Sequence, residues 1–292
     1  MRFDLVTIFP EFFAGFFAHG ILRRAQAEGL VQIGVHDLRA FTHDRHRTVD
    51  DRPFGGGEGM VLKPEPLAEA LESIGVGTRT HTDQTTLGHD FSHAEQPAFQ
   101  EAALAPATRS AVILTSAQGR RFDQSIARQL AQLDRIVLIC GRYEGVDERI
   151  NELFCDMELS IGDYILSGGE LAAAVVLDAT MRLIPGVLGN EASGEFESFG
   201  VADIAITTAV EGVPRSQHGA GGLLDYPHYT RPAEFRGLST PAVLLNGDHQ
   251  QIRRWRREQQ LRKTLANRPD LLENAPLSEE DRKILRNLER ER

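Results

Sequence analysis

Apolar runs alternate with amphipathic stretches over the first two thirds of the chain. Short runs rich in β-branched residues predict strands, and stretches with helical periodicity between them predict helices. The predicted strands are RFDLVTIF (with Pro10 opening a helix after it), VQIGVHDL, AVILTS and RIVLICG; the predicted helices are PEFFAGFFAHGILRRAQAEG, FDQSIARQLAQL and GVDERINELF. This alternation predicts an α/β fold with a largely parallel sheet. The unbroken RIVLIC run predicts a central strand buried on both faces.

Two stretches interrupt the alternation and predict the domain boundaries. Residues 76–110 are polar, rich in Thr and Ala and without a period, which predicts a mobile surface insertion. Residues 200–222 predict a second long loop, and the pattern beyond about Pro241 is helical. We therefore expect an α/β domain over 1–189, a linker over 190–222 and a small helical domain over 223–292.

Composition narrows the class of protein. With 292 residues, 41% apolar and 25% charged, the chain is typical of a soluble globular protein. Its two cysteines, Cys140 and Cys155, are too few to staple a fold of this size, which favours a reducing compartment. Asp4, Pro10 and Glu11 interrupt the apolar N-terminus where a signal peptide needs a continuous run. We expect a cytoplasmic protein that does not enter a membrane.

The distribution of charge points to a polyanionic partner more than its total does. A net charge of −10 argues against nucleic acid. Between Leu245 and Arg268, however, seven basic residues stand against two acids: Arg253, Arg254, Arg256, Arg257, Arg262, Lys263 and Arg268. This surplus suits phosphate contacts. A solvated helix face explains the charge alone equally well.

Glycine-rich turns supply the candidate ligand site. Gly141 to Gly145 follows the predicted central strand, and ligands of open α/β sheets bind at the carboxyl ends of strands. Neither G-x-G-x-x-G nor a P-loop occurs, which counts against nicotinamide enzymes, ordinary Rossmann methyltransferases and P-loop nucleotidases. The segment SIGDYILSGGE offers backbone groups and apolar side chains that suit a purine with a short charged tail. Each turn taken alone is equally compatible with a purely structural loop.

Several long motifs, in order, carry a family resemblance. FTHDRHRTVDDRPFGGGEGM, LICGRYEGVDER, SIGDYILSGGE, RLIPGVLGNEAS, LLDYPHYTRP and PAVLLNGDHQQIRRWRREQ closely resemble the bacterial tRNA (guanine-N1)-methyltransferases of the TrmD type. The resemblance implies a SPOUT-type α/β domain with a C-terminal trefoil knot, followed by a small helical domain. It implies a homodimer with shared active sites. It also implies methyl transfer from S-adenosylmethionine to N1 of guanosine 37 in tRNA, beside the anticodon, with Mg²⁺ assisting.

The resemblance also assigns residues. The expected cofactor-binding residues are Ser116, Gly119, Gly141, Tyr143, Glu144, Gly145, Ile161, Gly162, Asp163, Tyr164, Ile165, Leu166, Gly168 and Gly169. The expected tRNA-binding residues are Arg52, Gly57, Gly59, Arg231, Arg253, Arg254 and Arg256. Arg182 stands at the position of the family's catalytic arginine. Trp255 is expected to be a core anchor more than a base-stacking residue.

The chain departs from the family pattern at the expected general base. The family usually has Glu-Asp-Ser-Phe after the GNEAS-like stretch, whereas this chain has Phe196-Glu197-Ser198-Phe199. Glu197 takes the place of the aspartate and has the same chemistry with one more methylene, so we expect it to be the base, with Glu195 as the alternative. Two other functions stay open: a SPOUT methyltransferase acting on another RNA site, and a tRNA-binding homologue without catalysis.

Overall fold

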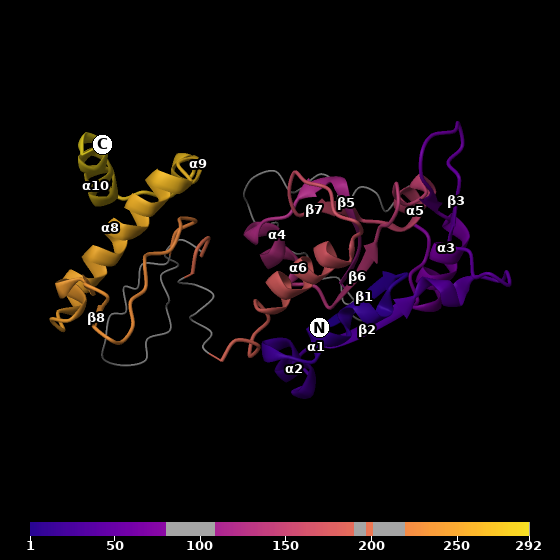
Figure 1. The fold of residues 1–292 in the computed structure, drawn as a ribbon, viewed down its shortest axis with the longest axis horizontal. Coiled ribbons are helices and arrows are strands. Elements are labelled where there is room, and N and C mark those ends of the chain that lie inside the picture. The colour runs from indigo at the N-terminus through magenta and orange to yellow at the C-terminus, as the bar shows by residue number, and fades with distance from the viewer. Residues whose placement is uncertain (80–108, 190–196, 201–219, 292) are drawn as a thin grey trace, which may run out of the picture. The chain divides into compact units, whose positions relative to one another are not determined.

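The computed structural model describes residues 1–79, 109–189, 197–200 and 220–291. The chain divides into two compact units, Met1–Gly189 and Asn190–Arg292, called here the N-terminal and C-terminal units (Figure 1). Most of the predicted insertion, the alternative base Glu195 and most of the predicted linker lie outside the described residues. Among the described residues, no helix is both long and apolar enough to cross a membrane.

A five-stranded parallel sheet organises the N-terminal unit (Figure 1). Its order is β2-β1-β6-β5-β7, and every neighbouring pair runs parallel. The strands are β1 (Arg2–Thr7), β2 (Gln32–Asp37), β5 (Ser110–Arg121), β6 (Arg135–Cys140) and β7 (Met157–Ser160). The strand predicted from the RIVLIC run, β6, lies in the middle and is buried along nearly its whole length.

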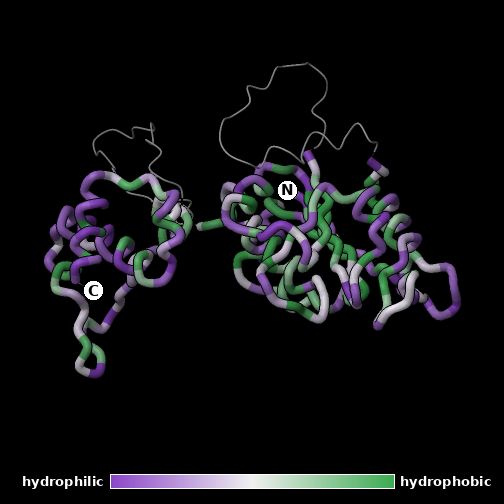
Figure 2. The backbone as a smooth tube through the Cα atoms, turned by 90° about the horizontal axis from the view of Figure 1, so that it is seen from above, coloured by the Kyte–Doolittle hydropathy of each residue, from purple (hydrophilic) through white to green (hydrophobic). Residues whose placement is uncertain are grey.

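Helices cover both faces of the sheet because successive side chains of a strand point to opposite faces. Phe3 and Leu5 of β1 belong to one core cluster and Val6 to the other. The first cluster includes residues of α2 (Gly20–Ala27), α4 (Gln124–Leu130) and α6 (Glu170–Met181); the second includes residues of α3 (Pro64–Ser73) and α5 (Glu148–Phe154). In Figure 2 hydrophobic segments, drawn in green, gather in the interior of the N-terminal unit.

The helix predicted over residues 10–29 is broken into three pieces. A 3-10 turn at Pro10–Phe13 leads into the short α1 (Ala14–Phe17), and α2 begins at Gly20. His19 is extended and Gly20 has a φ of 62°, which a right-handed helix does not contain. The apolar periodicity crosses this break, so it could not reveal it. Two short strands, β3 (Asp50–Asp51) and β4 (Val61–Leu62), pair antiparallel further along.

Strand β5 is twice as long as the apolar run that predicts it. Its first half pairs with β6 and β7, and after a register shift its polar second half pairs with β7 again. Leu159 of β7 is the partner of both Thr115 and Arg120, so the two halves of β5 flank β7. A Cβ on Gly119 would lie 2.5 Å from the backbone of Glu158 and Leu159, so this crossing requires glycine.

The C-terminal unit is a small helical assembly with one hairpin. Its elements are β8 (Glu234–Phe235), β9 (Leu238–Ser239), a 3-10 turn at Ala242–Leu244, α8 (His249–Asn267), α9 (Asp270–Glu273) and α10 (Glu279–Arg290). Leu223, Leu261, Leu285 and Leu288 form its buried core. Asp281 of α10 ties the two long helices together, because it accepts from Arg257 of α8 at 2.8 Å and 2.9 Å.

Candidate functional site

A cavity of about 410 Å³ opens beside the middle of β5 and the carboxyl ends of β6 and β7. Three segments line it: Thr115 to Gln118 within β5, Gly141 to Val146 after β6, and Ser160 to Gly169, apart from Asp163, from the end of β7 onward. Every residue predicted to bind the cofactor lines this cavity except Gly119 and Asp163. The volume falls within the range of small-molecule sites, about 300–1,000 Å³.

Glycines let the backbones of these segments approach one another. The amide of Gly169 donates to the carbonyl of Gly141 at 2.8 Å. A Cβ on Gly169 would lie 2.1 Å from Oγ1 of Thr115 and 2.8 Å from the amide nitrogen of Gly141. No side chain fits there, so glycine at this position holds the second and third segments together.

The turn after β6 is strained at a residue that faces the cavity. Tyr143 has a φ of 59°, although it is not a glycine, and its side chain is half-exposed. Residues other than glycine adopt this left-handed backbone conformation where the surrounding structure enforces it, often at ligand sites. The Gly55–Gly59 loop braces the same turn: Glu144 donates its amide to the carbonyl of Met60 at 3.0 Å, and a Cβ on Gly59 would overlap the Glu144 side chain.

A buried ion pair fastens the third segment to the second. Arg142 donates Nε to Glu170 at 3.0 Å and Nη1 to the carbonyl of Ser167 at 2.8 Å. Glu170 is 1% exposed and also accepts from Oγ1 of Thr7 at 2.8 Å. The guanidinium of Arg142 lies 4.5 Å from the ring centre of Phe9. The sequence motifs contain Arg142 and Glu170 but do not predict their pairing, because the two residues are 28 positions apart and belong to different motifs.

The charged side chains that line the cavity are mostly acidic. Glu144, Glu148 and Glu158 line it beside a single arginine, Arg142, which Glu170 already pairs. The lining therefore suits a ligand that carries positive charge. Burial first, and then the charge of Glu170, raise the pKa of Cys140 well above its usual range, so its thiol stays protonated.

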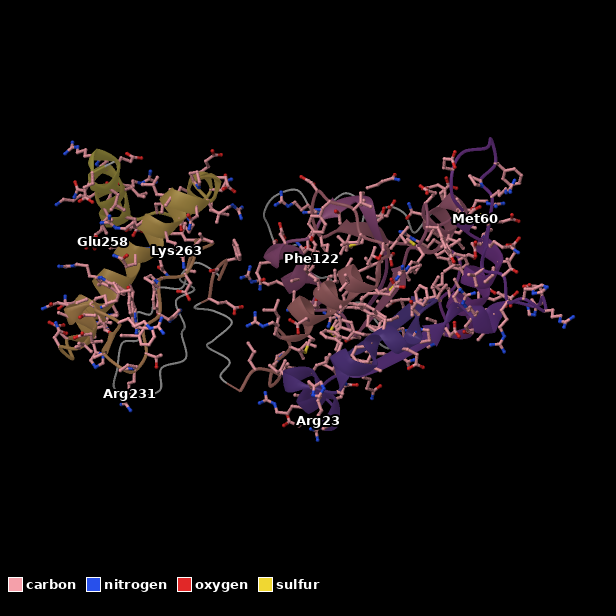
Figure 3. The ribbon with its side chains drawn as sticks, viewed as in Figure 1. Arg23, Met60, Phe122, Arg231, Glu258 and Lys263 are labelled. Atoms are coloured by element: carbon pink, nitrogen blue, oxygen red, sulfur yellow. The ribbon has the colours of Figure 1, made fainter. Side chains whose placement is uncertain are left out.

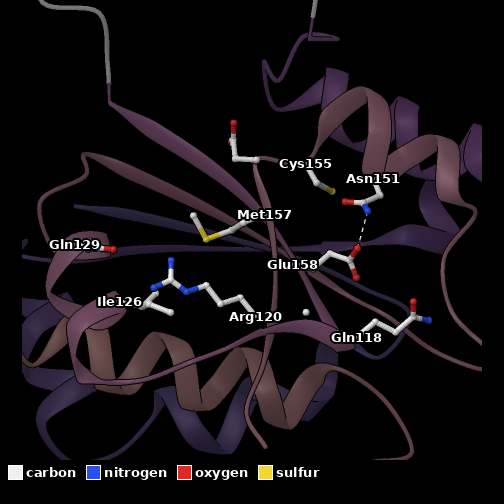
Figure 4. Close-up of a pocket in the computed structure, with 10 residues that line it drawn as sticks. Gln118, Arg120, Ile126, Gln129, Asn151, Cys155, Met157 and Glu158 are labelled. Atoms are coloured by element: carbon white, nitrogen blue, oxygen red, sulfur yellow. Dashed lines mark hydrogen bonds between the residues drawn. The ribbon is translucent and has the colours of Figure 1, made fainter. Parts of the chain in front are cut away.

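Two predicted cofactor residues lie elsewhere. Gly119 lines a neighbouring cavity of about 420 Å³, and a Cβ on it would meet the backbone of β7. Asp163 lies in the tight turn closed by the hydrogen bond from the Tyr164 amide to the Gly162 carbonyl, and its side chain is exposed. Glu158 lines both cavities, and Asn151 donates to it at 2.6 Å (Figure 4).

Arg182, one of the two predicted catalytic residues, is not among the residues that line this cavity, and Glu197 belongs to the other unit. Arg182 follows the last residue of α6, whereas the cavity lies at the first turn of that helix. At 1.5 Å per residue, the backbone positions of Glu170 and Arg182 are roughly 18 Å apart along the axis. Glu197 belongs to the C-terminal unit, where its carbonyl accepts from the Gly200 amide at 3.0 Å. Beside it, Oγ of Ser198 accepts from the amide of Asp225 at 2.9 Å.

The predicted tRNA-binding residues occur in both units. Arg52 is exposed, and Gly57 and Gly59 have φ values of 125° and 81°. Arg231 lies in the C-terminal unit, and Lys263 and Glu258 mark the middle of α8 (Figure 3). The exposed arginines of α8 are Arg253, Arg254, Arg256 and Arg262.

Aromatic side chains stand beside these arginines. The Arg256 guanidinium lies 4.8 Å from the centre of the Tyr226 ring, and Trp255 is half-buried with its ring 6.3 Å from that of Tyr229. Arg257 differs from its neighbours because it is largely buried, where it forms a bidentate pair with Asp281.

No metal centre is evident in the described part of the chain. No three His, Cys, Asp or Glu side chains gather there in a way that could hold a metal ion. His43, one of two closely spaced histidines, pairs with Glu69 at 2.8 Å.

Together these features define an α/β protein with a glycine-lined cavity of small-molecule size and acidic lining in a parallel-sheet unit, followed by a small helical unit with exposed arginines. The model of the family described as tRNA (Guanine-1)-methyltransferase TrmD matches two overlapping segments, residues 1–105 and 94–274. The chain therefore belongs to this family.

Individual relatives agree with the family match over nearly their whole length. The chain is 53% identical over 288 residues to the tRNA (guanine-N(1)-)-methyltransferase of Koribacter versatilis, covering 99% of this chain and 98% of the relative. It is 46% identical over 289 residues to the protein of that name from Geobacter metallireducens, again with 99% and 98% covered. The Dehalococcoides mccartyi protein of the same name is 45% identical over 285 residues, with 98% and 96% covered.

Proposed function

We propose that this protein transfers a methyl group from S-adenosylmethionine to N1 of guanosine 37 in tRNA. The observation that carries the proposal is the cavity beside the middle of β5 and the carboxyl ends of β6 and β7, together with membership of the TrmD family. S-adenosylmethionine carries a sulfonium and an ammonium, and the acidic lining suits that charge. We propose that the exposed Tyr164 and Ile165 cover its purine and that the glycine segments bind it through their backbones.

The chain's own residues have two tasks in the reaction. Bound S-adenosylmethionine supplies an electrophilic methyl group. Guanine N1 carries a proton at neutral pH, so a base must take that proton while N1 forms its new bond. We assign the base to Glu197 and the cation that stabilises negative charge developing on O6 to Arg182.

The placement of Arg182 supports a homodimer with shared active sites. Arg182 and the cavity of its own chain lie at opposite ends of α6, so we propose that Arg182 serves the cavity of a second copy. Leu171 and Val175, one helical turn apart on α6, are 50% and 45% exposed and offer an apolar face for that copy. We further propose that the crossing of β5 around β7 belongs to a trefoil knot.

Two further properties implied by the family are also proposals. We propose that the C-terminal unit and the Gly55–Gly59 loop contact tRNA and that the protein works in the cytoplasm. We assign no residue to Mg²⁺, because no three His, Cys, Asp or Glu side chains gather in a way that could hold a metal ion among the described residues.

The test is methylation of two tRNA transcripts that differ at position 37. After incubation with the protein and S-adenosylmethionine, mass spectrometry should find 1-methylguanosine in the transcript with guanosine 37 and none in the transcript with adenosine there. Methylation at another nucleoside would favour a SPOUT enzyme of different specificity. Absence of both methylation and S-adenosylmethionine binding would favour a non-catalytic homologue.

The assignment of the base needs its own variants. We expect Glu197→Gln to lose turnover while it keeps cofactor affinity, because the change removes only the proton acceptor. Near-normal turnover of Glu197→Gln with loss in Glu195→Gln would assign the base to Glu195 instead.

A further inference from the structure

The hairpin of the C-terminal unit carries a strained arginine at its tip. Strands β8 and β9 are joined by Arg236 and Gly237, with φ values of 53° and 81°. Positive φ at both central residues defines a type I′ turn, in which Asn, Asp or Gly is favoured. Arginine costs conformational free energy at the first of these positions. A strained position of this kind suggests that its side chain is retained for a contact.

The side chains at the tip are exposed and apolar. Phe235 and Leu238 are register partners, so they lie on the same face, and they are 61% and 77% exposed. The guanidinium of Arg236 lies 5.2 Å from the centre of the Phe235 ring. The tip therefore presents an aromatic face and a cation together.

The surrounding charge selects the chemistry of a partner. Residues 226–268 contain nine Lys and Arg against three Asp and Glu, a net charge of +6 along the sequence, although the whole chain has a net charge of −10. Four of these arginines, Arg254, Arg257, Arg262 and Arg268, form ion pairs with carboxylates. A basic segment in an acidic protein favours a polyanion. Exposed aromatics beside arginines are typical of surfaces on which unpaired nucleotide bases stack.

We infer that the hairpin tip, residues 235–238, contacts an unpaired nucleotide of the tRNA, with Phe235 stacked on the base and Arg236 paired with a phosphate. This inference rests on the proposed function, because that function supplies the RNA. The cofactor cavity plays no part in it, so the two can fail separately.

The experiment measures tRNA binding by the full-length protein over a series of salt concentrations. Arg236→Asn suits the turn, so its melting temperature should equal or exceed that of the wild type. Its tRNA affinity should fall, and the slope of log affinity against log salt should decrease by about 0.7, the value for one phosphate contact on a single strand. Phe235→Ala should weaken binding roughly 5- to 150-fold with an unchanged slope, since one base stack is lost.

Two further variants make the result specific. Phe235→Trp keeps an aromatic face and should retain affinity. Leu245→Ala removes a side chain that is 62% exposed, as Phe235 is 61% exposed, but lies outside the hairpin, and it should bind tRNA like the wild type.

Either of two results would overturn the inference. One is wild-type tRNA affinity in both Phe235→Ala and Arg236→Asn. The other is a change of oligomeric state in Phe235→Ala, seen by sedimentation, which would mean that the tip covers a second copy. If the wild type binds tRNA through the hairpin but transfers no methyl group, the proposed function fails and the inference stands.

Discussion

The cavity of the N-terminal unit and the arginine-rich surface of the C-terminal unit are built in opposite ways. The cavity depends on the backbone: close glycine contacts and a buried ion pair hold three segments together. The surface depends on exposed side chains, chiefly Arg236, Arg253 and Arg256, carried by a hairpin and a helix. The shape of the cavity depends on how three segments pack, whereas the arginine-rich surface depends on which side chains are exposed. Substitutions that disturb packing should therefore affect the first, and substitutions that remove charge should affect the second.

The sharpest contrast concerns ion pairs. Glu170→Ala removes one partner of a buried pair and leaves Arg142 without its carboxylate, so the free energy of unfolding should fall by about 3 kcal/mol. Cofactor affinity should fall as well, because the side chain of Arg142 then keeps its hydrogen bond to Ser167 but loses the one to Glu170. Chemical denaturation and calorimetry measure the two effects.

The matched control for Glu170 is an exposed pair. Arg254 and Glu280 lie 3.6 Å apart with both side chains about two-thirds exposed, so Glu280→Ala should cost less than about 1 kcal/mol. Equal losses in the two variants would show that the pair at the cavity has no special role in stability.

The glycine contacts of the cavity can be tested by adding a single methyl group. Gly169→Ala places a Cβ against Thr115 and the backbone of Gly141, and overpacking of this kind should weaken S-adenosylmethionine binding by about 100-fold. Gly15→Ala is the control, because no atom lies within 4 Å of the added Cβ. Unchanged calorimetric affinity in Gly169→Ala would mean that the cofactor binds elsewhere.

Neighbouring arginines of α8 should behave differently. Arg256→Ala should weaken tRNA binding roughly tenfold and reduce its salt dependence, with little change in the melting temperature. Arg257→Ala should lower the melting temperature of the C-terminal unit, because Asp281 loses its bidentate partner. If Arg256→Ala and Arg257→Ala both weakened tRNA binding and neither lowered the melting temperature, the assignment of Arg257 to the core would be wrong.

The smallest predicted effect is a pH dependence in the C-terminal unit. Burial tends to raise the pKa of Asp281, but the hydrogen bonds from Arg257 and Ser278 outweigh it and lower that pKa. Asp281 therefore contributes stability above its unfolded pKa of about 3.9, and this contribution is lost as the pH falls through the lower folded value. The stability difference between the wild type and Asp281→Asn should shrink from pH 5 to pH 3 in denaturant titrations.

The sequence predicts the parts of the fold that follow from apolar periodicity. The RIVLIC run becomes the central strand β6, and the glycines that follow it line the cavity, as the rule for carboxyl strand ends requires. Two elements could not be predicted from an apolar pattern. The polar second half of β5 depends on its register with β7. The hairpin of β8 and β9 depends on the turn between them.

The site is predictable to a similar extent. The lining segments follow from motifs, whereas the Arg142–Glu170–Thr7 network depends on contacts between distant positions. The proposed roles of Arg182 and Glu197 rest on family resemblance. Arg182 does not line the cavity of its own unit, and Glu197 belongs to the C-terminal unit.

The most direct test of the separation between the two regions is a pair of binding constants measured on two variants. Gly169→Ala should lose S-adenosylmethionine affinity and keep tRNA affinity, and Arg236→Asn should do the reverse. If each variant lost both ligands to the same extent, the cofactor cavity and the tRNA surface would not be the separate sites described above.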